Sequence, residues 1–94
     1  MPQTQKVSGR STWVFNDGTY NVVQYQATPV VRWNDDEIIL NTGGWMSMTT
    51  RTRMNQASHQ FDLDFTVNQE NHEWFVYYKG KKIPFISDEL VLKR

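Results

Sequence analysis

The 94-residue sequence contains no cysteine. A disulfide framework, a zinc site built on thiolates and a cysteine nucleophile are therefore excluded. The sequence also has no excess of charge of one sign, because ten basic residues balance ten acidic ones. Proteins that coat nucleic acid non-specifically usually carry a basic excess, since their affinity comes from neutralising phosphates. Any contact with nucleic acid is therefore expected to be short and local.

Long apolar runs are also missing. No run approaches the roughly 18 residues that a membrane span needs, and residues 1–6 lack the apolar core of a signal peptide. We therefore expect a soluble protein that is not exported and has no membrane partner. The length fits one domain. Four Trp, four Tyr and five Phe can supply its core, because aromatic side chains bury large areas.

Short apolar or alternating stretches, separated by turn residues, predict strands along most of the chain. Two hairpins are expected before residue 41, with turns at residues 16–18 and 34–36, where Asn, Asp and Gly favour tight turns. Alternation returns at residues 62–67 and 74–78. Residue stretches 83–85 and 90–92 are short and apolar. On residues 74–78 both faces are expected to be buried.

One helix is predicted, from Thr49 onward and about three turns long. Met54, Ala57 and Phe61 recur at helical spacing, and either Ser47 or Thr49 can serve as the N-cap. The resulting fold class is α+β: a small antiparallel, curled sheet of about five to seven strands packed on a single central helix. Residues 1–10 are polar and aperiodic and are expected to form a flexible tail, which leaves residues 11–94 as the domain.

No catalytic constellation stands out. His59 and His72 are the only candidate bases for a serine triad, and neither lies near a nucleophile turn of the G-x-S-x-G kind. Asp62 and Asp64 share a strand face but lack the calcium-loop signature. No Walker or dinucleotide fingerprint is present. We therefore expect a non-enzymatic protein with no catalytic residue, no metal site and no cofactor.

The segment from residue 42 to residue 55 combines features of an anion site. Paired glycines and an aromatic residue precede a helix start that is rich in hydroxyls, and two arginines fall in its first turn. First-turn N–H groups have no intrahelical partner and carry partial positive charge, which favours phosphate. Arginine binds phosphate in a bidentate manner, and a tryptophan can stack on a base. The predicted ligand-binding residues are Gly43, Gly44, Trp45, Thr49, Thr50, Arg51, Arg53 and Asn55, and the predicted ligand is a nucleotide or a nucleic-acid backbone.

Two alternatives stay open at this level. In the first, the threonines only cap the helix and the arginines pair with Asp62 or Asp64. In the second, the protein is an interaction module or inhibitor that docks on a protein partner through a sheet edge or an aromatic patch. Trp13, Trp33 and Tyr77 are the candidates for such a patch if they are exposed. The sequence leaves the oligomeric state open.

The motifs T-G-G-W at residues 42–45 and T-T-R-x-R-x-N-Q at residues 49–56, followed by W-F-V at 74–76 and I-P-F at 83–85, resemble a family of small proteins encoded by tailed bacteriophages. The resemblance covers roughly residues 20–86. It implies a hairpin, a glycine–tryptophan turn, a T-T-[KR]-x-R-x-N helix start and a closing aromatic strand. It also implies expression in the cytoplasm of a bacterial host, where small phage proteins often bind host factors, including defence proteins.

Overall fold

The computed structural model describes residues 11–44 and 46–94. Within these residues the chain forms eight strands and one helix. The elements before the helix are β1 (Thr12–Asn16), β2 (Asn21–Tyr25), β3 (Thr28–Trp33) and β4 (Glu37–Asn41). The helix α1 (Met48–Gln60) is followed by β5 (Phe65–Glu70), β6 (Glu73–Tyr78), β7 (Lys81–Pro84) and β8 (Glu89–Lys93).

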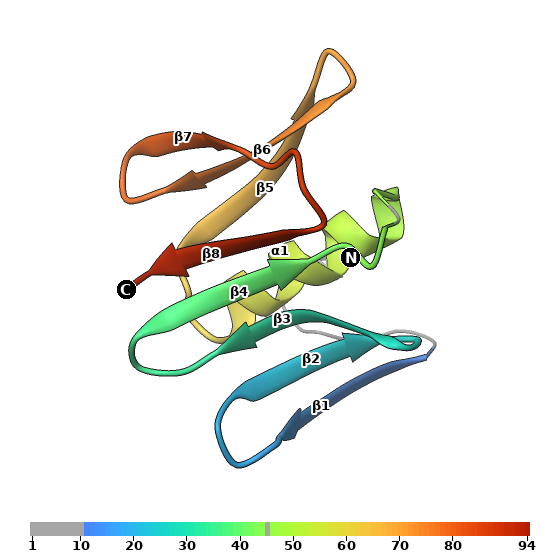
Figure 1. The fold of residues 1–94 in the computed structure, drawn as a ribbon, viewed down its shortest axis with the longest axis vertical. Coiled ribbons are helices and arrows are strands. Elements are labelled where there is room, and N and C mark those ends of the chain that lie inside the picture. The colour runs from blue at the N-terminus through green and yellow to red at the C-terminus, as the bar shows by residue number, and fades with distance from the viewer. Residues whose placement is uncertain (1–10, 45) are drawn as a thin grey trace.

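The strands form two antiparallel sheets, one of five strands in the order β1-β2-β3-β4-β8 and one of three in the order β5-β6-β7. Helix α1 lies behind the five-stranded sheet in Figure 1 and contacts β2, β3 and β5. The α+β class is confirmed. The expected five to seven strands are approximate: eight strands form two sheets instead of one. After β7 the chain crosses back, and β8 pairs with β4 in the larger sheet.

Both predicted hairpins are present, and side chains close their turns. The Asn16 side-chain oxygen accepts from the Gly18 amide at 2.8 Å, and an Asp17 carboxylate oxygen accepts from the Tyr20 amide at 2.7 Å. In the second turn, the Asn34 side-chain oxygen accepts from the amides of Asp36 and Glu37 at 2.9 and 3.0 Å. Short Asn and Asp side chains favour such turns because they bond to the backbone two or three residues onward.

Helix α1 begins at Met48 and has Ser47 as its N-cap, which confirms one of the two predicted caps. The Ser47 hydroxyl oxygen accepts from the Thr50 amide at 3.1 Å. On the predicted apolar stripe, Met54 and Ala57 are fully buried. Phe61 caps the other end of the helix, and its ring lies 4.7 Å from the ring of Trp33 between centroids.

One core lies between the two sheets and the helix. Its largest fully buried side chains include Phe85, Ile38, Leu40 and Met54. On β6 the expected burial of both faces is only half right, because Trp74, Val76 and Tyr78 are buried whereas Tyr77 is exposed. In the described part of the chain, no helix is long and apolar enough to cross a membrane. The predicted tail, residues 1–10, lies outside the described residues.

Candidate functional site

In the predicted anion site, the backbone angles and hydrogen bonds of the two glycines are explained by the turn itself. Gly43 and Gly44 have φ angles of +66° and +88°, which glycine adopts without strain. A Cβ at Gly43 would also collide with the side chain of Thr28. The two glycine amides donate to side chains just before them, Gly43 to Asn41 at 2.7 Å and Gly44 to Thr42 at 3.2 Å. Trp45 lies outside the described residues.

The two threonines at the start of the helix differ in burial. Thr50 is buried and accepts a hydrogen bond from the Ser47 hydroxyl at 3.1 Å, whereas Thr49 is partly exposed. The first helical turn contains no acidic residue. A hollow of about 220 Å³ opens beside it, and the side chains that line this hollow are mostly polar: Tyr25, Gln26, Thr28, Val30, Thr42, Ser47 and Thr50.

The two arginines of this segment do not converge. The Arg51 guanidinium donates to the side chain of Gln69 on β5 at 3.4 Å. Arg53 instead donates through Nε to the Thr12 hydroxyl on β1 at 2.9 Å, and its guanidinium lies 5.6 Å from the centroid of the Tyr25 ring. Among the described residues, neither arginine forms an ion pair with Asp62 or Asp64. Arg53 therefore ties the helix to β1 and β2, and Arg51 leans toward the other sheet.

Asn55, the last residue of the predicted site, covers the outer side of β5. Its side-chain amide donates to the Val67 carbonyl at 3.0 Å and accepts from the Val67 amide at 2.8 Å. One helical turn later, the Ser58 hydroxyl donates to the Phe65 carbonyl at 2.6 Å and accepts from the Phe65 amide at 2.9 Å. The two side chains thus take the place of a neighbouring strand, and the sequence signal for this role is their spacing of three residues on one helix face.

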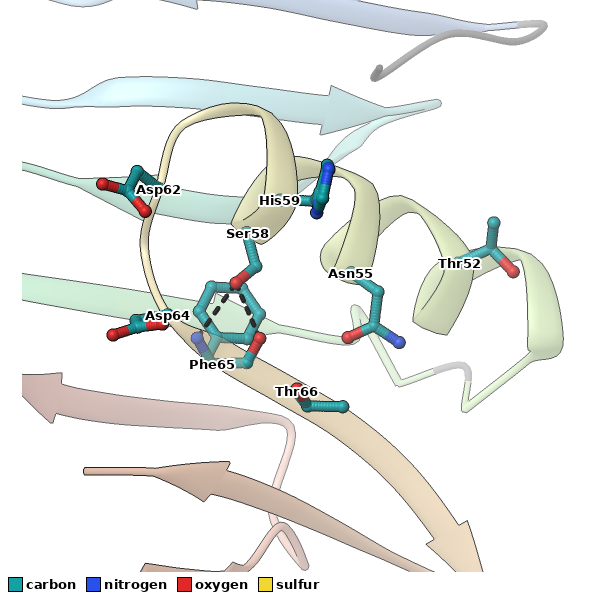
Figure 2. Close-up of a pocket in the computed structure, with 8 residues that line it drawn as sticks. All are labelled: Thr52, Asn55, Ser58, His59, Asp62, Asp64, Phe65 and Thr66. Atoms are coloured by element: carbon teal, nitrogen blue, oxygen red, sulfur yellow. Dashed lines mark hydrogen bonds between the residues drawn. The ribbon is translucent and has the colours of Figure 1, made fainter. Parts of the chain in front are cut away.

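A hollow of about 590 Å³ lies where α1 meets the start of β5 (Figure 2). Dashed lines in Figure 2 mark the bonds between Ser58 and Phe65, which both line this hollow. Asp62 and Asp64 stand at one end of the hollow, and both have positive φ angles, +57° and +69°. No group of three or more His, Asp or Glu side chains suited to a metal ion occurs in the described ranges.

Two further outer strands carry residues that discourage strand addition. On β7 these are Lys81, Lys82 and Pro84, because lysine charges repel an incoming strand and proline has no N–H to offer it. On β8 the charged residues are Glu89, which pairs with Arg32 at 3.1 Å, and Lys93, which pairs with Glu37 at 3.6 Å. The Lys79 ammonium also donates to the Lys93 carbonyl at 3.3 Å.

The fourth outer strand, β1, differs from these three. Trp13, Val14 and Phe15 are 53%, 48% and 43% exposed, and the strand contains no charged residue and no proline. Among the described residues its only strand partner is β2. Of the three aromatic residues singled out in the sequence, Trp13 is thus exposed on an edge and Trp33 is buried. Tyr77 is exposed but donates to Glu70.

Along β1, the backbone N–H and C=O groups of successive residues point alternately toward β2 and toward the outer side of the sheet. The Gln26 amide donates to the Ser11 carbonyl at 2.7 Å, and the Asp17 amide donates to the Tyr20 carbonyl at 3.0 Å. Hydrogen-bonded and non-bonded pairs alternate along an antiparallel ladder. Trp13 and Phe15 therefore bond to β2, whereas the N–H and C=O of Val14 point to the outer side of the sheet.

An apolar row crosses the sheet face that α1 does not cover. Successive register pairs connect Phe15 to Val22, Arg32, Ile39 and Val91, one residue from each strand. Val22 and Ile39 are buried, whereas Phe15 and Val91 are more than two-fifths exposed. Arg32 interrupts the row, and its Nε is buried with no hydrogen-bond partner among the described residues. This face, which is continuous with the β1 edge through Phe15, is hereafter the helix-free face.

Hydrogen bonds lower the pKa of three carboxylates on or beside these strands. Backbone hydrogen bonds from Tyr20 and Thr19 lower the pKa of Asp17, which follows β1. The hydrogen bond from Tyr20 lowers the pKa of Glu37 on β4. On the three-stranded sheet, the hydrogen bond from Lys82 lowers the pKa of Glu70, with a smaller contribution from Tyr77. These carboxylates all therefore stay ionised near neutral pH.

Comparison with known proteins assigns the chain to a family. A family model described as Kyanoviridae Gp96 protein matches residues 2–92, nearly the whole chain. The chain belongs to this family. The expected relation to small phage proteins is thereby confirmed at the level of the family. No curated protein and no solved structure matches the chain.

Proposed function

We propose that this phage protein is a non-enzymatic protein-binding module that pairs the outer side of β1 with an extended strand of its partner. The observation that carries the proposal is the contrast between β1 and the other outer strands. Edge strands normally carry charge, proline or a cover, since an open edge is a template for pairing. β1 combines exposed Trp13, Val14 and Phe15 with an outward-pointing backbone at Val14.

Strand addition suits this edge on energetic grounds. Main-chain hydrogen bonds give an added strand its affinity, and side chains on alternating positions give it specificity. Trp13 and Phe15 lie on the helix-free face, since they pair with Gln24 and Val22 of β2, and both are large enough to act as anchors. Tryptophan is enriched among the residues that dominate binding energy at interfaces. A partner strand with apolar side chains at alternate positions fits this arrangement.

The test compares matched lysine variants in affinity capture from infected host cells. Val14→Lys places a charge on the β1 edge, and Val91→Lys places one at a similarly exposed position on β8, 44% against 48%. Proteins captured by the unmodified chain and by Val91→Lys, but lost with Val14→Lys, are then purified and tested for direct binding. Direct binding that Val14→Lys abolishes supports the proposal. Capture and direct binding that do not change in Val14→Lys contradict it.

A second candidate function is the binding of a phosphate-bearing ligand at the residues from Gly43 to Asn55. Two observations favour it: the first turn of α1 has no acidic residue, and a hydroxyl-lined hollow opens beside Ser47 and Thr50. The expected ligand is small, because the chain carries no net charge. Thermal-shift measurements with nucleotides and short oligonucleotides test it. A ligand at a hundred times its dissociation constant stabilises the fold by about 2.7 kcal/mol, and no shift at millimolar ligand contradicts it.

A further inference from the structure

We propose that the strand added to β1 is β1 of a second copy of this chain, so that two copies form one continuous antiparallel sheet around a two-fold axis at Val14. The inference rests on the proposed function and names its partner. It follows from the register that the strand allows, from its charge pattern and from the direction of its backbone.

The register follows from alternation along the strand. With the axis perpendicular to the sheet, the helix-free faces of both copies lie on the same side, so that residues of like orientation must pair. Centring the axis on Val14, the middle residue of β1, pairs the strand over its full length. Val14 then lies opposite Val14 of the second copy, and Trp13 lies opposite Phe15. The helix-free face gains a cluster of four rings at the junction.

The backbone of Val14 points in the direction that this register requires. Its N–H and C=O face the outer side of the sheet, as the bonds flanking β1 show. Two Val14 residues opposite each other on the axis therefore form a hydrogen-bonded pair, in which each N–H donates to the other carbonyl. An axis on Trp13 or Phe15 would place on the axis a residue whose backbone already bonds to β2.

Charge favours the antiparallel arrangement over the parallel one. Arg53 lies beside the N-terminal end of β1, where its Nε donates to the Thr12 hydroxyl. Asp17 follows the C-terminal end of the strand. An antiparallel pair brings the Arg53 end of each copy to the Asp17 end of the other. A parallel pair would bring like charges together at both ends. The strand itself carries no charge, and the chain has no net charge that would make two copies repel.

The first test is the mass of the full chain in solution, measured by sedimentation over a range of concentrations. The expected species has twice the 11.1 kDa mass of one copy. Val14→Lys should reduce it to one copy, because two lysines would meet on the axis. Val91→Lys should leave it paired, because β8 lies at the far edge of the sheet. Circular dichroism checks that both variants fold.

A charge exchange tests the register itself, also where Val14→Lys fails to fold. Trp13→Lys and Phe15→Glu should each weaken self-association. In a pair of identical copies, either substitution removes one ring from both Trp13–Phe15 pairs. A mixture of the two variants should associate, since Lys at position 13 of one copy then faces Glu at position 15 of the other while one Trp13–Phe15 pair is kept. Restored association in the mixture alone supports the inference.

Three results would overturn the inference. The full chain could sediment as one copy at all concentrations, its double mass could survive Val14→Lys, or the mixed variants could fail to associate. In the first case the capture experiment still tests the proposed function. If the chain sediments as one copy and Val14→Lys loses a captured partner, a different protein binds at the same edge. A chain of one copy in which Val14→Lys loses no partner contradicts both.

Discussion

The outer strands β1 and β5 end their sheets in opposite ways. On β5, the side chains of Asn55 and Ser58 bond to the N–H and C=O groups of Val67 and Phe65. On β1, an apolar strand leaves the backbone of Val14 directed outward. A helix lies close enough to β5 to cover it, as Figure 1 shows. The comparison indicates that two short polar side chains are enough to cover a strand edge, whereas β1 has no such cover among the described residues.

The largest expected effect comes from uncovering β5. Ser58→Ala leaves the buried N–H and C=O of Phe65 without a partner, and each buried group so orphaned costs about 1–3 kcal/mol. We expect a loss of about 2–4 kcal/mol in the free energy of unfolding, measured by urea denaturation. Thr52→Ala is the matched control on the same helix and should change the stability by less than about 0.5 kcal/mol. Equal stability in Ser58→Ala and the control would show that water replaces the hydroxyl.

Asn55→Ala should have a smaller effect than Ser58→Ala. Asn55 is only partly buried, so water can reach the freed backbone groups of Val67 more easily. We expect a loss of about 1–2 kcal/mol, which lowers the melting temperature by roughly 4–16 °C in a domain of this size. The melting temperature of Asn55→Asp adds a second measurement, because the carboxylate can accept from the Val67 amide but cannot donate to its carbonyl. A melting temperature between those of Asn55→Ala and the unmodified chain is expected.

Substitutions of Arg53 and Arg51 should differ in their effect on the free energy of unfolding. Arg53→Glu removes the bond to Thr12 and the contact with the Tyr25 ring, so we expect a loss of about 1–2 kcal/mol by chemical denaturation. Arg51→Glu removes one 3.4 Å bond to Gln69 and places a negative charge in the first helical turn, which is favourable there. Its stability should stay within about 0.5 kcal/mol of the unmodified chain. The opposite order would show that Arg53 does not hold β1.

The smallest expected effect is the pH dependence that Glu70 contributes. Its pKa in the folded chain is lowered from 4.5, first by the hydrogen bond from Lys82. A lowered folded pKa gives stability that is present above the unfolded pKa and lost as the pH falls through the folded pKa. The melting temperature of Glu70→Gln should therefore fall less between about pH 6 and about pH 3 than that of the unmodified chain.

Much of the fold was predictable because its signals are local. Turn residues such as Asn16 and Asn34 form their bonds within three positions, and Ser47 caps the helix through Thr50. The division into two sheets was not predictable in this way. It depends on β8 pairing with β4, about fifty residues earlier, and alternation along β8 does not reveal which strand is its neighbour.

The site was harder to predict than the fold. The sequence marks the residues from Gly43 to Asn55 as unusual, but residue spacing does not show that Arg51 and Arg53 extend toward different sheets. The sequence also does not show that the side-chain amide of Asn55, a predicted ligand-binding residue, bonds to the backbone of β5. The run of Trp13, Val14 and Phe15 was visible in the sequence. Its exposure was not, because only the strand order shows that β1 lies at an edge.

Hydrogen exchange of single amides tests the contrast between the two edges most directly. The amides of Phe65 and Val67 should exchange slowly at every protein concentration, because side chains of the same copy bind them. The amide of Val14 should exchange rapidly in dilute solution and become protected as the concentration rises and copies pair. Protection of Val14 that does not vary with concentration, in a chain that sediments as one copy, would contradict the account, because the β1 edge would then be covered from within.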